Sequence, residues 1–175
     1  WVMFTATGSY ILDPVTGKLR RFSRLNIKNG NVTRDNKGNA WVHNYTGNVW
    51  YVNTSTGDIK PFQFLSSEHL GYIDVERYSI IHDSRDIIWI TTYGNGLFAY
   101  DLNTGGLQHF TFEVSHSSHI NSNYLQYIIE DRSGGIWVSS EFSGLSHLEI
   151  LNKGTLRIYP NGENASDRSN TIRML

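Results

Sequence analysis

The apolar and polar positions between residues 124 and 159 predict a small antiparallel sheet. Residues 124–130, 136–140, 145–149 and 156–159 form short apolar runs rich in β-branched and aromatic side chains. The sequences between the runs, Asp-Arg-Ser-Gly, Phe-Ser-Gly and Lys-Gly, are turn sequences in which Asp can bond the backbone and Gly can adopt positive φ. Four strands joined by tight hairpins are therefore expected.

The same order of strands and turns occurs upstream. Residues 78–82, 88–92, 97–100 and 107–110 are again apolar runs, and Asn-Thr-Gly-Gly separates the last two. The pattern is thus a repeat, and each copy is expected to form a similar sheet.

Tryptophans mark the repeat at a regular spacing. Distances of 40, 48 and 48 residues separate Trp1, Trp41, Trp89 and Trp137. A glycine follows seven residues after three of these tryptophans and six after the second, at Gly8, Gly96, Gly144 and Gly47. Repeats of about 40–50 residues with turn glycines at fixed offsets are typical of β-propeller blades. The predicted fold is all-β, built from propeller blades of four antiparallel strands.

The repeat also divides the chain. We expect one propeller segment over residues 1–175, with units at about 1–30, 31–70, 71–120 and 121–168. The first unit lacks its opening strand, and residues 169–175 resemble the strand opener at 122–128, so they predict the first strand of a further blade. This strand could pair with the first unit and close a four-bladed ring, or the chain could be a fragment of a larger propeller. We favour the larger propeller, since both ends fall at the same exposed hairpin of the repeat.

An aspartate stands six residues before the tryptophan in three units, at Asp35, Asp83 and Asp131. A residue that recurs once per unit is better interpreted as a turn former than as a catalytic group. After Asp83, Asp86 replaces the turn glycine found at Gly38 and Gly134, so that turn is expected to differ or to carry strain.

Composition excludes several classes of function. Aromatic residues make up 13% of the chain and charged residues 18%, and the net charge is −1. A near-neutral chain without a Lys/Arg run lacks the concentrated positive charge that binds nucleic acid. The absence of Cys excludes a disulfide framework, a thiol nucleophile and a cysteine metal site. No apolar run reaches the roughly 18 residues that a membrane span needs, so any anchor would lie in flanking sequence.

The sequence Ile-Glu-Asp-Arg-Ser-Gly-Gly-Ile-Trp-Val at residues 129–138, followed by Ser-Gly-Leu at 143–145, resembles the two-component regulator propeller repeat. Residues 81–100 are similar to it as well, and the resemblance covers nearly the whole chain. The departures are His82 and Arg34 in the place of the motif's Glu, and a looser Gly-Leu step in the first two units.

This resemblance implies a function. In that family the repeats form the periplasmic sensor of membrane-anchored histidine kinases, often hybrids, and the ligands are often glycan fragments. The chain would then be a ligand-sensing module without enzymatic activity or a cofactor. Its partner would be an oligosaccharide, and the parent inner-membrane protein would be a homodimer.

The residues four positions after each tryptophan vary while the scaffold repeats: Thr5, Tyr45, Tyr93 and Glu141. In a propeller the loops joining strands two and three share one face with the connectors between blades, where ligands commonly bind. Aromatic rings can stack on apolar sugar faces, and polar groups can fix the orientation. We predict ligand-binding residues at Tyr45, Tyr93, Glu141 and Phe142, and no catalytic or metal site.

Two other functions stay open at this point. A propeller lyase or glycoside hydrolase could use Glu130, Glu141 or a connector histidine. The connector histidines His116 and His119 are three residues apart, but no third metal ligand stands at a recognisable spacing. The chain could also be a protein–protein interaction scaffold, as many propellers are.

Overall fold

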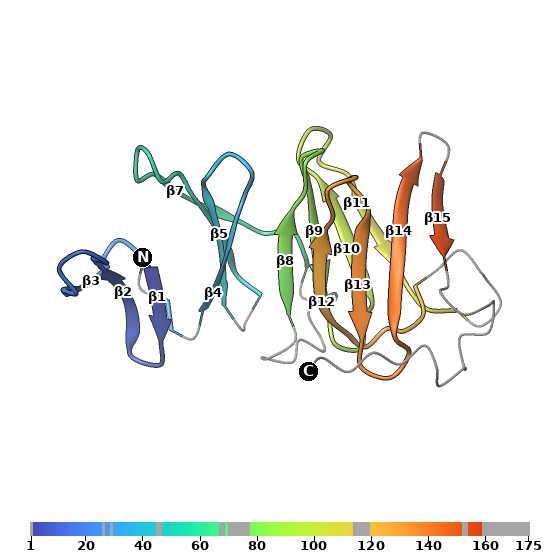
Figure 1. Cartoon of the computed structure of the whole chain (residues 1–175), viewed down its shortest axis with the longest axis horizontal. Helices are drawn as coiled ribbons and strands as arrows, with labels where there is room; N and C mark the ends of the chain where they lie inside the picture. Colours follow the sequence, from blue (N-terminus) through green and yellow to red (C-terminus); the bar gives the residue numbers. More distant parts are fainter. Residues whose placement is uncertain are drawn as a thin grey trace. The chain divides into compact units, whose positions relative to one another are not determined.

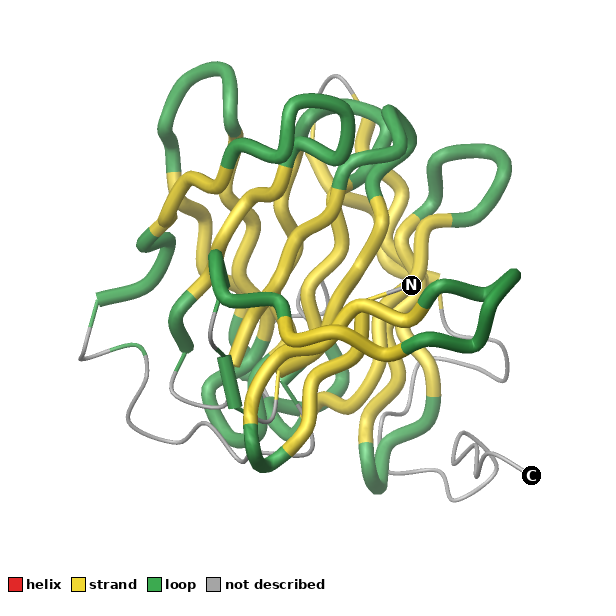
Figure 2. Tube along the Cα trace, turned by 90° about the vertical axis from the view of Figure 1, so that its left-hand side faces the viewer, coloured by secondary structure: helices red, strands yellow, loops and turns green. Residues whose placement is uncertain are grey.

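The computed structural model describes residues 2–25, 27–28, 30–44, 47–66, 69, 78–113, 120–151 and 154–158. All the regular elements within these residues are β-strands, joined by turns and loops (Figure 2). The expected all-β fold is confirmed. This described part contains no helix long and apolar enough to cross a membrane.

The chain divides into two compact units, Trp1–Gln63 and Phe64–Leu175. The first unit contains a three-stranded sheet of β1 (Val2–Thr5), β2 (Gly8–Leu12) and β3 (Leu19–Arg21), and a four-stranded sheet of β4 (Gly30–Arg34), β5 (Ala40–Asn44), β6 (Val49–Val52) and β7 (Ile59–Phe62). All neighbouring strands are consecutive in sequence and antiparallel. The first of these sheets has three strands, whereas the second has four. The strand predicted at residues 169–175 lies outside the described residues.

The second unit contains two four-stranded sheets (Figure 1). Blade 3 comprises β8 (Ser79–His82), β9 (Ile87–Thr91), β10 (Leu97–Asp101) and β11 (Leu107–Phe110). Blade 4 comprises β12 (Leu125–Glu130), β13 (Ile136–Ser140), β14 (Leu145–Leu151) and β15 (Gly154–Ile158). Each is an antiparallel meander, and the strand limits agree with the sequence prediction to within one or two residues.

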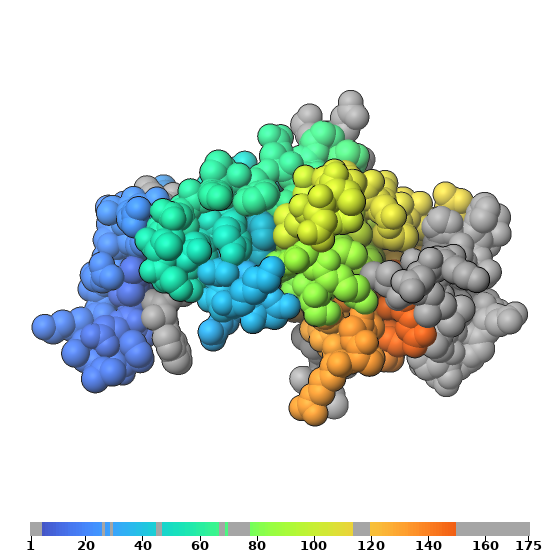
Figure 3. All heavy atoms as spheres, turned by 90° about the horizontal axis from the view of Figure 1, so that it is seen from above, coloured from blue at the N-terminus to red at the C-terminus, as the bar shows by residue number. Residues whose placement is uncertain are grey.

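Blades 3 and 4 pack face to face around one apolar core, and their side chains lie against each other in Figure 3. Blade 3 contributes Trp89, Leu97 and Ala99, and blade 4 contributes Leu125, Ile128, Ile136, Val138 and Leu148. Leu125 and Ile128 are three residues apart, yet both face this core, because the pairing of β12 with β13 shifts register between them. Burial of each large apolar side chain stabilises the blade pair by about 1.5–3 kcal/mol.

The first unit has its own smaller core, formed by Leu25, Ile27 and Val42. The buried side chain of Ser9 on β2 binds the segment between β3 and β4, which contains Ile27. Its hydroxyl donates to the Ile27 carbonyl at 3.0 Å and accepts from the Ile27 N–H at 2.9 Å. The segment between the two sheets is therefore tied to the first of them by a buried polar pair.

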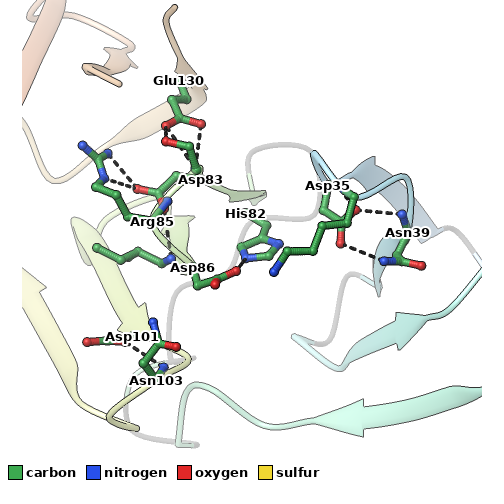
Figure 4. Close-up of polar contacts among 12 residues, drawn as sticks. Asp35, Asn39, His82, Asp83, Arg85, Asp86, Asp101, Asn103 and Glu130 are labelled. Atoms are coloured by element: carbon green, nitrogen blue, oxygen red, sulfur yellow. Dashed lines mark hydrogen bonds and ion pairs between the residues drawn. The ribbon is translucent and has the colours of Figure 1, made fainter. Parts of the chain in front are cut away.

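The turn containing Asp86 keeps the conformation of its glycine counterparts. Gly38 and Gly134 both have φ of 84°, and Asp86 has φ of 64°. Asp86 is the single non-glycine residue with positive φ within the described part of the chain. Its carboxylate lies 2.9 Å from Nε2 of His82 on the preceding strand (Figure 4). The expected anomaly is thus backbone strain at Asp86 rather than a different turn.

Candidate functional site

The recurring aspartates organise turns, as their repetition predicted. Asp83 accepts the N–H groups of Arg85 and Ile87, each at 2.9 Å, through one carboxylate oxygen. The other oxygen accepts the indole N–H of Trp89 at 2.9 Å. The six-residue spacing therefore lets one buried carboxylate close the β8–β9 turn and fix the tryptophan on the next strand.

Asp131 repeats this arrangement in blade 4. It accepts the N–H groups of Ser133 and Gly135 at 2.8 and 3.0 Å and the indole N–H of Trp137 at 2.6 Å. The hydrogen bond from the Ser133 hydroxyl, followed by that from Trp137, holds the pKa of the Asp131 carboxyl far below its usual range. Both aspartates are engaged in structural hydrogen bonds, and the lowered pKa of the Asp131 carboxyl is the opposite of what a general acid needs.

The loop between β9 and β10 carries Tyr93 at the opposite end of blade 3. The N–H and the hydroxyl of Thr92 both donate to the Gly96 carbonyl, at 3.0 and 2.7 Å, and close the loop. The N–H groups of Gly94 and Gly96 then donate to the carbonyl of Asn123, at 2.8 and 3.1 Å. This loop is thereby bound to the segment that opens blade 4.

The loop between β13 and β14 is closed in the same way and carries Glu141. The N–H and hydroxyl of Ser140 both donate to the Gly144 carbonyl at 2.9 Å. The N–H of Glu141 donates to the Tyr124 carbonyl at 3.1 Å, and its carboxylate accepts the phenolic hydroxyl of Tyr93. Two of the predicted binding residues, 48 positions apart in sequence, are therefore in direct contact.

Tyr124 completes the cluster. It forms an isolated antiparallel bridge with Tyr93, and the two rings meet edge to face with centroids 5.1 Å apart. We name Tyr93, Tyr124, Glu141 and Phe142 the loop-face cluster. The sequence prediction missed Tyr124, although its place at the end of a blade connector was the signal that could have identified it.

The loop-face cluster offers both apolar and polar contact surface. The side chain of Phe142 is 70% exposed and that of Tyr124 is 49% exposed, whereas Tyr93 and Glu141 are half-buried. The exposed rings can stack on an apolar ligand surface, and the Glu141 carboxylate can accept hydrogen bonds from hydroxyl or amine groups. This combination suits a small polyhydroxylated ligand.

Other sequence candidates fall elsewhere. Tyr45 lies outside the described residues, as do His116 and His119. Within the described part of the chain there is no group of three or more His, Asp or Glu side chains that could hold a metal ion. Ligand binding by Tyr45, Tyr93, Glu141 and Phe142 stays a prediction.

Glu130 lies at the other end of the blades and links them. Its two carboxylate oxygens accept the backbone N–H of Ser84 at 3.0 and 2.9 Å, and one also accepts the Ser84 hydroxyl at 2.5 Å (Figure 4). Ser84 belongs to the β8–β9 turn of blade 3, and Glu130 ends β12 of blade 4. The Glu of the Glu-Asp motif thus binds the turn of the preceding blade.

Comparison with known proteins identifies solved structures with a similar fold. No family model matches the sequence, and a search of curated proteins found no relative. Among solved structures, the chain is similar to the extracellular domain of BT3049 from B. thetaiotaomicron, described as a hybrid two component system, with a TM-score of 0.63 and 16% identity. The extracellular domain of BT4673 from the same organism matches with a TM-score of 0.59 and 15% identity.

A lyase has a similar structure. Virginiamycin B lyase from Staphylococcus aureus matches with a TM-score of 0.57 and 14% identity over 93% of this chain. The chain spans 20% of the BT3049 domain, 23% of the BT4673 domain and 56% of the lyase. At these identities the similarity establishes the fold, which is a series of β-propeller blades, as the repeat predicted.

Proposed function

We propose that this chain is part of the ligand-sensing domain of an extracytoplasmic two-component receptor. Two independent lines support this function. The Glu-Asp, Gly, Ile-Trp and Gly-Leu pattern resembles the two-component regulator propeller repeat. The chain also shares its fold with the extracellular domains of BT3049 and BT4673. The complete receptor would be a periplasmic sensor of a homodimeric inner-membrane histidine kinase.

The ligand site in this proposal is the loop-face cluster, and the ligand class is a glycan fragment. The observation that carries it is the contact between the Tyr93 hydroxyl and the Glu141 carboxylate, made from loops of two different blades beside the exposed rings of Tyr124 and Phe142. A sugar would stack on these rings, and its hydroxyl groups would donate to Glu141. A ligand that contacts both loops favours one relative setting of the blades, which is how binding energy shifts a receptor between states.

Calorimetric titration of the protein with a panel of neutral and charged oligosaccharides tests the site. We expect Glu141→Gln and Tyr93→Phe each to weaken binding of the responding sugar by about tenfold or more, because each removes a charge-assisted hydrogen bond. Glu149→Gln and Tyr100→Phe, the same substitutions elsewhere in the second unit, serve as matched controls and should bind like the parent. Equal affinity in all four variants, or no binding of any saccharide, would refute the proposal.

The similarity to a lyase supports a second candidate function, a propeller enzyme acting at the same face. Glu141 would then be the acid or base, since Glu130 is engaged by Ser84 at the other end of the blades. Turnover of a bound saccharide by the parent, lost in Glu141→Gln with binding retained, would establish the enzyme. Binding without turnover would support the sensor instead.

A further inference from the structure

Charged side chains are distributed unevenly between the two ends of blades 3 and 4. The Lys and Arg residues between positions 78 and 151 are Arg85 and Arg132. Both stand in the turn that joins the first two strands of their blade, β8 to β9 and β12 to β13. The Arg85 guanidinium is held there, 2.7 Å from the Asp83 carboxylate (Figure 4). The basic residues of this part of the chain therefore lie at the end opposite the loop-face cluster.

The end that carries the loop-face cluster has acidic side chains instead. The Glu141 carboxylate contacts the Tyr93 hydroxyl. Exposed Glu113 follows Phe112, whose N–H donates to the side-chain oxygen of Asn123 at 2.7 Å. Asn123 also binds the β9–β10 loop through its backbone carbonyl, so Glu113 belongs to the same end of the blades. A ligand that approaches the loop-face cluster therefore meets negative charge without a nearby Lys or Arg from residues 78–151.

The aromatic rings of the loop-face cluster add to this preference for positive charge. The Tyr93 and Tyr124 rings have centroids 5.1 Å apart, and the Tyr93 hydroxyl contacts the Glu141 carboxylate. Exposed Phe142 is the next residue on the same loop. The face of an aromatic ring is electronegative and attracts an ammonium group that lies within about 6 Å of its centroid. Rings and carboxylate thus favour the same ligand chemistry, an ammonium group attached to a body with an apolar face.

We propose that the loop-face cluster selects amino sugars, saccharides with a free protonated amine, over their neutral, N-acetylated and carboxylated counterparts. This inference rests on the function proposed above, because it names the class of glycan that the same site takes. The ammonium donates to the Glu141 carboxylate beside the Tyr93 and Tyr124 rings, and the sugar ring stacks on Phe142. N-acetylation removes the positive charge, and a uronate brings a second carboxylate next to Glu141, so both changes weaken binding.

Calorimetric titration of the whole chain with four related disaccharides tests the selectivity. The ligands are chitobiose with free amines, diacetylchitobiose, cellobiose and cellobiouronic acid, which share one sugar skeleton and differ in charge. We expect chitobiose to bind about tenfold or more tighter than cellobiose and diacetylchitobiose, because it adds a charge-assisted hydrogen bond and a cation–π contact. Cellobiouronic acid should bind most weakly. The advantage of chitobiose should shrink at high salt, because salt screens the attraction between ammonium and carboxylate.

Two substitutions of one residue separate the charge of the site from its shape. Glu141→Gln keeps the size of the side chain and should reduce the affinity ratio of chitobiose to cellobiose several-fold. Glu141→Lys should reverse the order, so that cellobiouronic acid binds more tightly than chitobiose. Glu149→Gln and Glu149→Lys, which change a carboxylate on β14 away from the cluster, are the matched controls and should keep the order of the parent. Tryptophan fluorescence shows whether each variant is folded.

The outcomes distinguish this inference from the proposed function. If cellobiose or diacetylchitobiose binds as tightly as chitobiose, the selectivity for amino sugars is wrong, whereas a saccharide sensor remains supported. A preference for chitobiose that is unchanged in folded Glu141→Gln and Glu141→Lys also overturns the inference, because another group would then recognise the amine. Putrescine that binds as tightly as chitobiose and competes with it would show that the site recognises an amine without its sugar. Binding of none of the saccharides would overturn both proposals.

Discussion

His43, on β5 of the first unit, is a buried histidine with a direct effect on stability. Its side chain is almost fully buried, and this desolvation lowers the pKa of the imidazole from 6.5 to about 4. The folded protein therefore keeps His43 neutral over a pH range in which the unfolded chain protonates it. Its contribution to stability is complete above pH 6.5 and is lost as the pH falls from 6.5 towards 4.

We expect the folded state to lose roughly 2 kcal/mol of stability through this one group between pH 7 and pH 5. Urea unfolding followed by tryptophan fluorescence at both pH values measures the loss. His43→Leu should reduce the pH dependence by about this amount, because it removes the group that the unfolded chain protonates. A His43→Leu variant with the parent's full pH dependence would contradict the assignment.

At the scale of the element, the β8–β9 hairpin of blade 3 is stabilised by one aspartate, which joins the turn to the adjacent strand. Asp83 is fully buried and holds the β8–β9 turn, the Trp89 indole and the Arg85 guanidinium, which lies 2.7 Å from it. Asp101 caps another turn of the same blade but is only half-buried, and its carboxylate accepts from nearby groups such as the Asn103 N–H at 2.8 Å. We therefore expect the two aspartates to differ in how much they stabilise the fold.

Asp83→Ala should lower the free energy of unfolding by roughly 3 kcal/mol or more, because it leaves buried donors and a partly buried arginine without their acceptor. Asp101→Ala, the matched control, should have a much smaller effect. Chemical denaturation of both variants gives the two values. Similar losses in the two variants would show that the buried hydrogen bonds of Asp83 with the turn and with Trp89 are not what stabilises the blade.

At the scale of the blade pair, polar links join blades 3 and 4 at both ends of their shared core. Ser84 and Glu130 meet at the β8–β9 turn, and Tyr93 and Glu141 meet at the β9–β10 loop. The core between them supplies most of the stabilising energy, and the links define how the two sheets are aligned. Glu130 therefore acts across blades, although its motif neighbour Asp131 acts within one.

A double-mutant cycle on Ser84→Ala and Glu130→Ala measures the first link. We expect Glu130→Ala to destabilise the protein by roughly 1 kcal/mol, and less when Ser84 is already alanine, because the hydroxyl and the carboxylate share one hydrogen bond. The cycle is read from urea midpoints of the four proteins. Strictly additive effects would mean that the carboxylate stabilises the turn without the Ser84 hydroxyl.

Much of the fold could be predicted because the relevant signals are local. Hairpin turns, strand alternation and the Asp-to-Trp spacing each lie within a few residues, so the limits of the strands in blades 3 and 4 followed from the sequence to within one or two residues. Asp86 shows where such reasoning stops. Its replacement of glycine predicted either a different turn or strain, and only the structure shows that the turn is kept and that Asp86 takes the positive φ.

The sequence by itself determined the repeat, the strand order within each sheet and the structural role of Asp83 and Asp131, because hydrogen bonds between near neighbours decide these. Only the tertiary structure decided that Tyr93 meets Glu141 beside Tyr124, and that Glu130 binds Ser84. These contacts join residues about 46–48 positions apart or lie between separate loops. They exist because two blades pack face to face, and the register of that packing follows from the shared core rather than from any local pattern.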